Sequence, residues 1–231
     1  MLPADWAALA LYLVVWLGYE PILWRVSKAA GAIATDLTVV RAVWMRAMTA
    51  RHRHETRLLD GMLLGHVINS ASFFTSSNLI LTAGVAGVLF GGHATLGKAN
   101  EIGFAAGSLL LFHAKLTLVL AALARGLISF IWAIRQVNYC LALIGAAPEV
   151  GSDPALLRAY ADAVSDVLNP ALTSFSSGIR AYYFAMAAGA WLFGPALFAA
   201  GTLAIVAMLI FRQSSSRSAR GVRRARALLD E

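Results

Sequence analysis

The sequence predicts an all-α, polytopic membrane protein, on the grounds of composition, charge distribution and segment length. Of its 231 residues, 59% are hydrophobic and 13% are charged, whereas soluble domains contain about 45–50% and about 25%. The mean hydropathy is +0.70. Charged residues are clustered, so that long apolar runs alternate with charged segments. Because a helix needs about 20 apolar residues to cross a bilayer, we expect one membrane domain over 1–231 with about four transmembrane helices.

The first apolar run predicts a transmembrane helix over about 6–24. It ends in Trp24 and Arg25, an aromatic and basic pair that is typical of the membrane interface. The N-terminus has neither a basic segment nor a small-residue cleavage site, so we expect this helix to remain as an anchor. Residues 33–60 then place apolar side chains at helical spacing among basic ones, which predicts an amphipathic helix on or above the bilayer surface.

A second crossing is predicted over about 62–90, within a run that contains no Asp, Glu, Lys or Arg. Its first half is rich in hydroxyl and amide side chains, and a helix that is polar around much of its circumference should not face lipid. We therefore expect it at a centre between helices or between subunits. There it either packs through small residues or lines a water-filled path or binding groove. The candidate residues are Asn69, Ser72, Thr75, Ser76 and Asn78.

A third crossing is predicted over about 104–135, although Lys115, Arg125 and Arg135 interrupt it at intervals of ten residues. At 1.5 Å per residue these three cations span about 30 Å, one hydrocarbon thickness. A helix that crosses between Lys115 and Arg135 buries Arg125, which then needs a partner or water. A helix that crosses earlier buries Lys115 instead. Either alternative leaves one cation deep in the membrane.

The C-terminal third divides into three segments of different composition: an amphipathic helix over 153–177, a crossing over 181–211 and a basic tail over 212–231. Asp153 and Pro154 form a typical helix start, and the apolar residues that follow recur at helical spacing. We expect a kink at Pro170. The last crossing is long enough to tilt or to bend at the Phe-Gly-Pro motif that ends at Pro195.

The basic residues conflict with this count of crossings. Residues 25–60 carry seven Lys and Arg against three acids, and the tail carries six Arg. Lys and Arg collect on the cytoplasmic side, so an even number of crossings should separate the two blocks, whereas the simplest count gives three. Either one block breaks the rule, or residues 104–147 re-enter the membrane or cross it twice, which would give five helices.

Basic and amide side chains of the third and last crossings form a second group of candidates. Arg135 and Asn138 lie among aromatic residues, and Arg180 precedes two tyrosines. Interfacial anchoring by aromatic rings and snorkelling cations explains such residues without a ligand. Alternatively, Arg135 and Arg180 form a basic pocket with Lys115 or Arg125 for an anion or a lipid phosphate, because guanidinium groups bind phosphate bidentately.

Three blocks of the sequence carry a family pattern. They are NSASFFTSSNLILTAGVAGVL from Asn69, FIWAIRQVNYCLALIGAAP from Phe130 and GIRAYYFAMAAGAWLFGPALF from Gly178. In these blocks the chain resembles the uncharacterised membrane-protein family catalogued as domain of unknown function 599. The blocks together span most of the chain. The resemblance implies a multi-pass membrane protein and almost nothing about activity.

Several classes of function find little support in the sequence. The only cysteine, Cys140, excludes a Cys-based metal or cluster site, and His66 and His113 fall at different depths for a bis-histidine haem. The apolar helices contain no acid pair and no catalytic motif, so we expect no cofactor and no enzymatic activity. The positive charge fits a bilayer with anionic lipids better than nucleic acid.

We therefore expect a homo-oligomeric protein of the bacterial inner membrane whose second helix lines a polar pathway for a small ion. The deep cations favour an anion. The alternative is a non-catalytic accessory or scaffold subunit of a larger membrane complex, docked through the two amphipathic helices.

Overall fold

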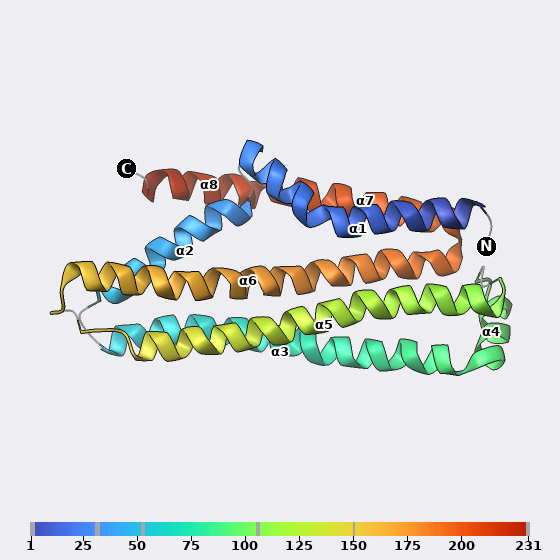
Figure 1. Ribbon diagram of the computed structural model, residues 1–231, viewed down its shortest axis with the longest axis horizontal. Coiled ribbons are helices and arrows are strands. Elements are labelled where there is room, and N and C mark those ends of the chain that lie inside the picture. The colour runs from blue at the N-terminus through green and yellow to red at the C-terminus, as the bar shows by residue number, and fades with distance from the viewer. Residues whose placement is uncertain (1–2, 31–32, 52–53, 105–106, 150, 230–231) are drawn as a thin grey trace.

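The computed structural model describes residues 3–30, 33–51, 54–104, 107–149 and 151–229, including all side chains except those of 20–30 and 54–56. The regular elements in these ranges are helices (Figure 1), which confirms the predicted all-α class. In chain order they are α1 (Pro3–Ala30), α2 (Ile33–Thr49), α3 (His54–Phe90), α4 (Gly92–Glu101), α5 (Leu109–Gly145), α6 (Pro154–Ala190), the 3₁₀ turn η1 (Trp191–Phe193), α7 (Pro195–Ser214) and α8 (Arg217–Leu229).

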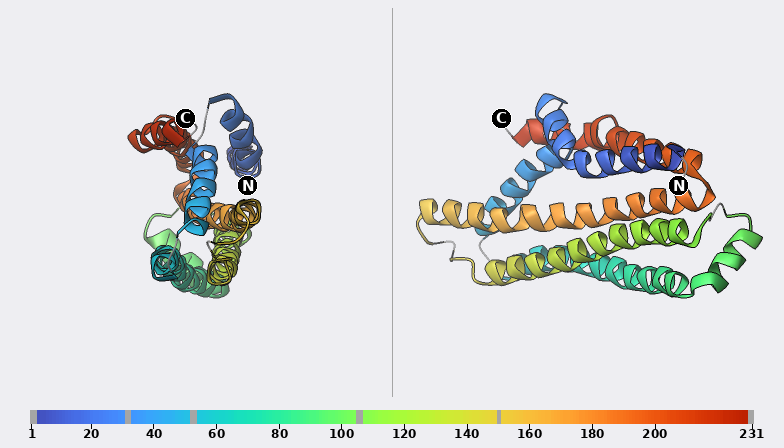
Figure 2. Two further views of the ribbon diagram at one scale, coloured as in Figure 1. Left: turned by 90° about the vertical axis from the view of Figure 1, so that its left-hand side faces the viewer. Right: turned by 45° about the vertical axis from the view of Figure 1, so that its right-hand side comes forward.

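The long helices lie side by side in an elongated bundle with α6 near its middle (Figures 1 and 2). α5 packs antiparallel along one side of α6, and α3 packs on α5 farther out. α1 and α7 pair on the other side of α6, while α2 and α8 join the bundle at the end where the C-terminus lies. α3 therefore forms one edge of the bundle, with α5 as its main neighbour in the described part of the chain.

The third apolar region forms one uninterrupted helix. The Ser108 side chain accepts a hydrogen bond from the Leu111 N–H and caps its start. The helix then continues to Gly145, so the alternative in which residues 104–147 cross twice is wrong. Nothing in the sequence ends the helix at Arg135, because buried apolar side chains recur on one face as far as Ile144.

The prediction of a single crossing over 181–211 is wrong, because the chain reverses direction within it. α6 ends at Ala190, a 3₁₀ turn follows, and Gly194 takes a φ of 124°. Only glycine adopts this conformation without strain. Pro195 then begins α7, since the first helical position needs no N–H donor. α6 and α7 consequently run antiparallel (Figure 1).

The amphipathic helix predicted over 153–177 is the first part of α6 rather than a separate element. It starts as predicted, with the Asp153 carboxylate accepting a hydrogen bond from the Ala155 N–H. It then runs through Pro170 to Ala190. A proline removes only one backbone hydrogen bond. Buried side chains before and after Pro170 pack on neighbouring helices and keep α6 continuous.

The amphipathic helix predicted over 33–60 is divided. α2 ends at Thr49, and α3 begins at His54, earlier than the sequence suggested. The Arg51 guanidinium donates to both oxygens of Asp60, whose side chain is buried, at 2.8 Å. This ion pair holds the end of α2 against the first turns of α3.

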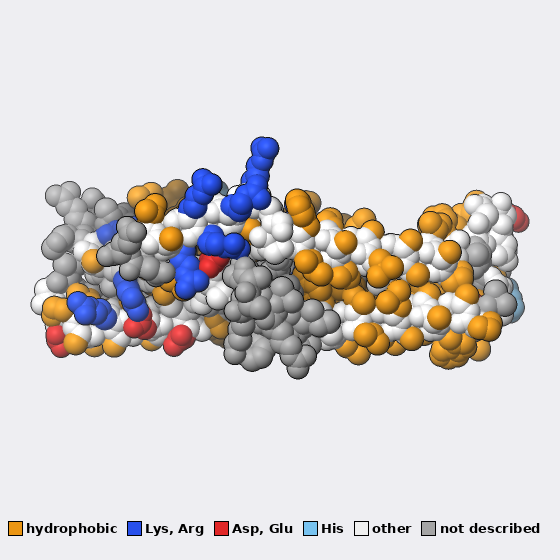
Figure 3. All heavy atoms as spheres, turned by 90° about the horizontal axis from the view of Figure 1, so that it is seen from above, with side chains coloured by type: hydrophobic (Ala, Val, Ile, Leu, Met, Phe, Trp, Pro, Cys, Tyr) orange, Lys and Arg blue, Asp and Glu red, His pale blue; other side chains and the backbone are white. Residues whose placement is uncertain are grey.

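Charged side chains gather at one end of the bundle, which we call the basic end (Figure 3). On the face in view, basic and acidic groups lie over the half that holds α2 and α8, while the other half is largely hydrophobic. The tail predicted over 212–231 contributes α8, whose Arg226 donates to the buried carboxylate of Asp36 in α2 at 2.7 Å. We call the opposite end, which holds α4 and the turn at Gly194, the far end.

Three helical segments of the described chain are long and apolar enough to cross a membrane: Arg57–Phe90, Leu109–Gly145 and Pro195–Leu229. A shorter apolar segment covers Pro3–Tyr19. By length and composition the chain is therefore a membrane protein.

Candidate functional site

Lys115 is a fully buried cation near the far end of α5. Its side chain is 1% exposed, which selects the alternative in which the third helix buries Lys115. Asp5 of α1, 3% exposed, attracts it electrostatically. Asp5 also accepts a hydrogen bond from the Trp191 indole at 2.9 Å, and the Lys115 ammonium lies 5.8 Å from the centroid of a Trp191 ring. The group joins α1, α5 and η1, so Lys115 is a structural cation with an internal counter-charge.

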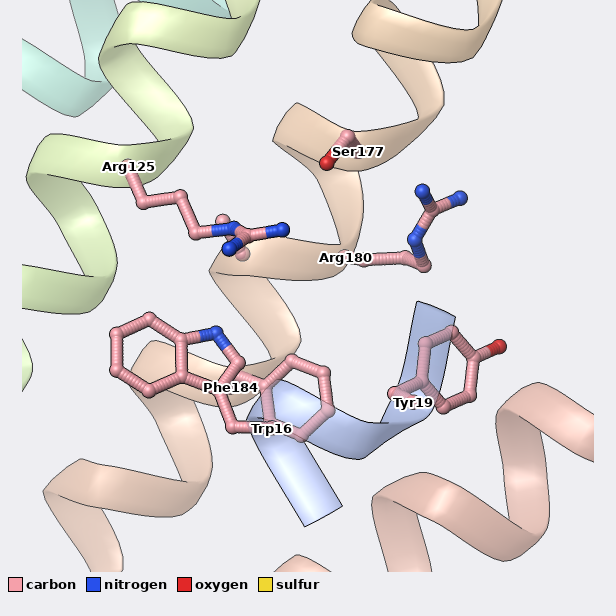
Figure 4. Close-up of a pocket in the computed structure, with 7 residues that line it drawn as sticks. Trp16, Tyr19, Arg125, Ser177, Arg180 and Phe184 are labelled. Carbon is pink, nitrogen blue, oxygen red and sulfur yellow. The ribbon is translucent and has the colours of Figure 1, made fainter. Parts of the chain in front are cut away.

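Arg125 and Arg180 line a small cavity between α1, α5 and α6 (Figure 4). Arg125 projects from α5 toward α6, and Arg180 lies one helix further round, above Tyr19 of α1. Ser177 of α6 and Trp16 of α1 contribute a hydroxyl and an indole to the lining. The cavity volume is about 10 Å³, roughly the space that one water molecule requires.

Aromatic rings hold both arginines of this cavity. The guanidinium carbon of Arg125 lies 6.0 Å from the Trp16 ring centroid, and that of Arg180 lies 5.9 Å from the Tyr19 ring centroid. Such cation–π contacts orient a guanidinium group without neutralising it. No acidic side chain is among the described residues that line the cavity. The arrangement can bind an anion.

The inward face of α3 uses its polar residues to attach the helix to α5. Asn78 is fully buried, and its side-chain N–H donates to the Leu123 carbonyl at 3.0 Å. The Thr82 hydroxyl donates to the Asn78 amide oxygen, and the Thr75 hydroxyl donates to the Ala71 carbonyl one turn earlier. For Asn78 and Thr75 the structure therefore favours helix packing, one of the two alternatives that the sequence left open.

The outward face of α3 carries the other predicted residues. Asn69, Ser72 and Ser76 are exposed on the surface of the chain. Their side chains form no hydrogen bond with the described part of the protein. A centre between helices of one chain is therefore wrong for these residues, and a centre between subunits remains a prediction.

Arg135 and Asn138 do not join the other cations. Both are exposed on α5. The Arg135 guanidinium lies 5.9 Å from the Trp132 ring centroid and donates to the Tyr139 hydroxyl at 3.3 Å. These contacts within one helix are those of an interfacial anchor. The predicted combination of Arg135 and Arg180 in one pocket is wrong, and the pocket forms from Arg125 and Arg180 instead.

Sequence reasoning missed the residues that complete these sites. Asp5 and Trp191 were not considered as partners of Lys115, and Trp16, Tyr19 and Ser177 were not assigned to an anion site. The two α1 aromatics are one helical turn apart, a signal that would have placed them on one face. Within the described chain, no three His, Cys, Asp or Glu side chains are grouped to hold a metal ion.

These features define a class: an all-helical membrane protein with a compensated cation in its interior, a basic cavity between three helices and an edge helix that is polar on its outer face. Comparison with family models goes one step further. Residues 7–218 match DUF599, described as a protein of unknown function, and the chain belongs to this family. The match confirms the resemblance of the three sequence blocks. No curated protein and no solved structure matches the chain.

Proposed function

We propose that the protein assembles from several copies in the bacterial inner membrane and forms a polar pathway for a small anion, lined by α3. The observation that carries this proposal is the outward exposure of Asn69, Ser72 and Ser76 on a helix that lacks formal charge along its apolar segment. Unpaired amide and hydroxyl groups are costly in hydrocarbon. A second copy, together with the water between copies, supplies the hydrogen bonds that the chain itself does not.

The glycines of α3 support close approach of another helix to the same edge. Cβ atoms added at Gly65, Gly84 and Gly87 would meet no atom within 4 Å. Packing within the chain therefore does not explain why these positions are glycine, although glycine costs a helix about 1 kcal/mol relative to alanine. Small residues let membrane helices approach closely, so a second copy of α3 accounts for them.

The antiparallel arrangement of α6 and α7 supports a definite topology. With α1 and the second half of α6 included, five segments cross, and four of these crossings separate the basic block at 25–60 from the arginine-rich tail. An even number places both blocks on one side, as the positive-inside rule requires. We therefore assign the basic end to the cytoplasm and the N-terminus to the opposite side.

The preference for an anion follows from the charges nearest to α3. The helix has no acidic side chain between Gly61 and Phe90, and Asn and Ser side chains offer N–H and O–H donors. Arg125 lies on α5, the helix against which α3 packs. Because Asp5 compensates Lys115, the arginines supply the positive field that favours an anion.

A flux assay in liposomes tests the pathway. Purified protein should pass halide ions faster than alkali cations, and the triple variant Asn69→Leu/Ser72→Leu/Ser76→Leu should lose most of this flux. Ser176→Leu changes an exposed serine of α6 whose hydroxyl is bonded to the Leu172 carbonyl, and it should leave the flux unchanged. Equal flux in empty and loaded liposomes would contradict the pathway.

Cross-linking tests the arrangement of copies independently of conduction. Cys140 is the only cysteine and is buried, so Cys140→Ala gives a background without reactive thiols. Ser72→Cys in that background should form disulfide-linked dimers in the membrane. Met186→Cys, on an equally exposed part of α6, should not. Equal cross-linking at both positions would remove α3 as the interface.

The alternative proposal, a non-catalytic accessory or scaffold subunit, has its own supporting observation. Leu58, Leu59, Met62 and Leu63 are all more than 50% exposed. They lie about 40 Å or more along α3 from Phe90, beyond one hydrocarbon thickness. An exposed apolar surface outside the membrane is a typical contact for another protein. Purification in a fixed ratio with other membrane subunits, without self-association, would favour this alternative.

A further inference from the structure

We infer that Arg125 and Arg180 bind a phosphate group, and that its most accessible source is an anionic phospholipid of the leaflet at the basic end. The two side chains come from adjacent helices and border one cavity, together with Trp16, Tyr19 and Ser177 (Figure 4). No residue of α3 lines this cavity in the described chain. The site is therefore separate from the proposed pathway, and either can fail without the other.

The chemistry of the lining suits a phosphate. Two guanidinium groups present planar forks of N–H donors that match phosphate oxygens. Ser177 adds a hydroxyl donor and Trp16 adds an indole N–H. The cation–π contacts of Arg125 with Trp16 and of Arg180 with Tyr19 restrict both forks before a ligand arrives, which lowers the entropy cost of binding.

The size of the cavity limits how the group enters. A volume of about 10 Å³ accepts one oxygen atom rather than a whole phosphate. One phosphate oxygen is therefore expected between the arginines, with the rest of the group and its substituent directed outward between α1 and α6. A phosphate diester can bind in this manner because it keeps two free oxygens.

The depth of the arginines favours a lipid as the source. Arg125 follows the first residue of α5 by 16 positions, or about 24 Å along the helix axis. The hydrocarbon layer is about 30 Å thick, so the arginine lies a few ångströms inside the boundary at the basic end, where long basic side chains reach the phosphate layer. Basic pockets between transmembrane helices on the cytoplasmic side bind anionic head groups in this way.

Native mass spectrometry of the full chain in detergent tests the inference. The probes are phosphatidylglycerol, inorganic phosphate and diacylglycerol, which lacks phosphate. Arg125→Gln/Arg180→Gln should weaken phosphatidylglycerol binding by about tenfold or more, as expected from the loss of charge-assisted hydrogen bonds. Arg217→Gln/Arg224→Gln removes the same charge from exposed positions of α8 and should change binding by less than about twofold.

Two further variants keep the test decisive if the double variant folds poorly. Ser177→Ala removes one hydroxyl donor without a change in charge and should weaken phosphatidylglycerol binding by a few-fold. Glu20→Gln removes the acidic residue next to Tyr19 in the sequence and should strengthen binding, because a carboxylate competes with phosphate for arginine. Weaker binding in Glu20→Gln, or none of these changes, would overturn the inference.

The three probes separate the two sources of phosphate. A preference for phosphatidylglycerol that disappears in Arg125→Gln/Arg180→Gln identifies a lipid head group. Binding of inorganic phosphate with the same dependence on the two arginines, and no added affinity for the lipid, identifies free phosphate. Equal binding of diacylglycerol and phosphatidylglycerol overturns both, because the acyl chains alone would then carry the affinity.

Discussion

α3 and α5 are two helices of equal length that the fold treats in opposite ways. Each contains 37 residues, and each includes a segment apolar enough to cross a membrane. Of the most apolar part, 33% of the residues in α5 are buried within the chain, against 6% in α3. Lys115 on α5 has Asp5 as its internal counter-charge, whereas Asn69 on α3 has no partner in the described chain. The polarity of α5 thus serves the fold, and the outer polarity of α3 concerns what lies outside the chain.

The largest effect should come from the counter-charge of α5. Asp5→Ala leaves Lys115 buried without compensation, and we expect a loss of about 3–5 kcal/mol in the free energy of unfolding. Titration with SDS in mixed micelles measures it. Asp5→Ala/Lys115→Met removes both charges and should recover much of the loss. If the single variant loses less than about 1 kcal/mol, α5 is not dependent on internal charge pairing.

A smaller loss is expected where α6 meets α5. A Cβ at Gly178 would lie 2.5 Å from a ring carbon of Phe130, which is fully buried. Gly178→Ala should therefore cost about 1–3 kcal/mol through overpacking, measured by the same titration. Gly189→Ala is the control, since its Cβ would meet nothing within 4 Å. Equal stability of the two variants would show that α6 can move away from α5.

The two faces of α3 provide a third, smaller contrast. Asn78→Ala removes the hydrogen bond to Leu123 and should lower the free energy of unfolding by about 1 kcal/mol. Asn69→Ala should change it by less than about 0.5 kcal/mol in dispersed monomers, because no contact within the chain is lost. A comparable loss in Asn69→Ala would place this side chain inside the fold and reverse the comparison.

The smallest effect on the monomer is expected at the outer edge of α3. Gly84→Ala meets no neighbouring atom and should leave the monomer unchanged or stabilise it by up to about 1 kcal/mol, through helix propensity. Self-association, measured by energy transfer between labelled copies, should nevertheless weaken. Unchanged association would remove the close approach of helices at Gly84 from the proposed assembly.

The sequence was sufficient for the membrane class and for the helices of both compared regions, because long charge-free runs have few alternatives to crossing. It was not sufficient for the reversal at Gly194. Hydropathy is high on both sides of the Phe-Gly-Pro motif and contains no information about chain direction. Gly194 followed by Pro195 was the available signal, and it was interpreted as a bend. The same limitation hid the continuity of α6 through Pro170.

Candidate residues were predictable by type more than by partner. Lys115, Arg125 and Arg180 were selected because charges are rare in apolar helices. The partner of Lys115 is Asp5, which lies on another helix and far away in sequence, so only the packing of α1 brings them together. The periodicity of α3 likewise showed two polar stripes. It could not indicate that the stripe with Asn78 packs on α5 and the one with Ser72 does not.

The length of α5 and α6 has a consequence for anything that approaches the protein from solution. Each helix has 37 residues, about 55 Å, so the hairpin of which they are the arms projects about 25 Å past the hydrocarbon. Ionic screening acts over about 8 Å at physiological salt. The hairpin tip, with Glu149 and Asp153, is therefore insulated from the lipid surface potential. An approaching molecule at that height responds to the local charge of the tip alone.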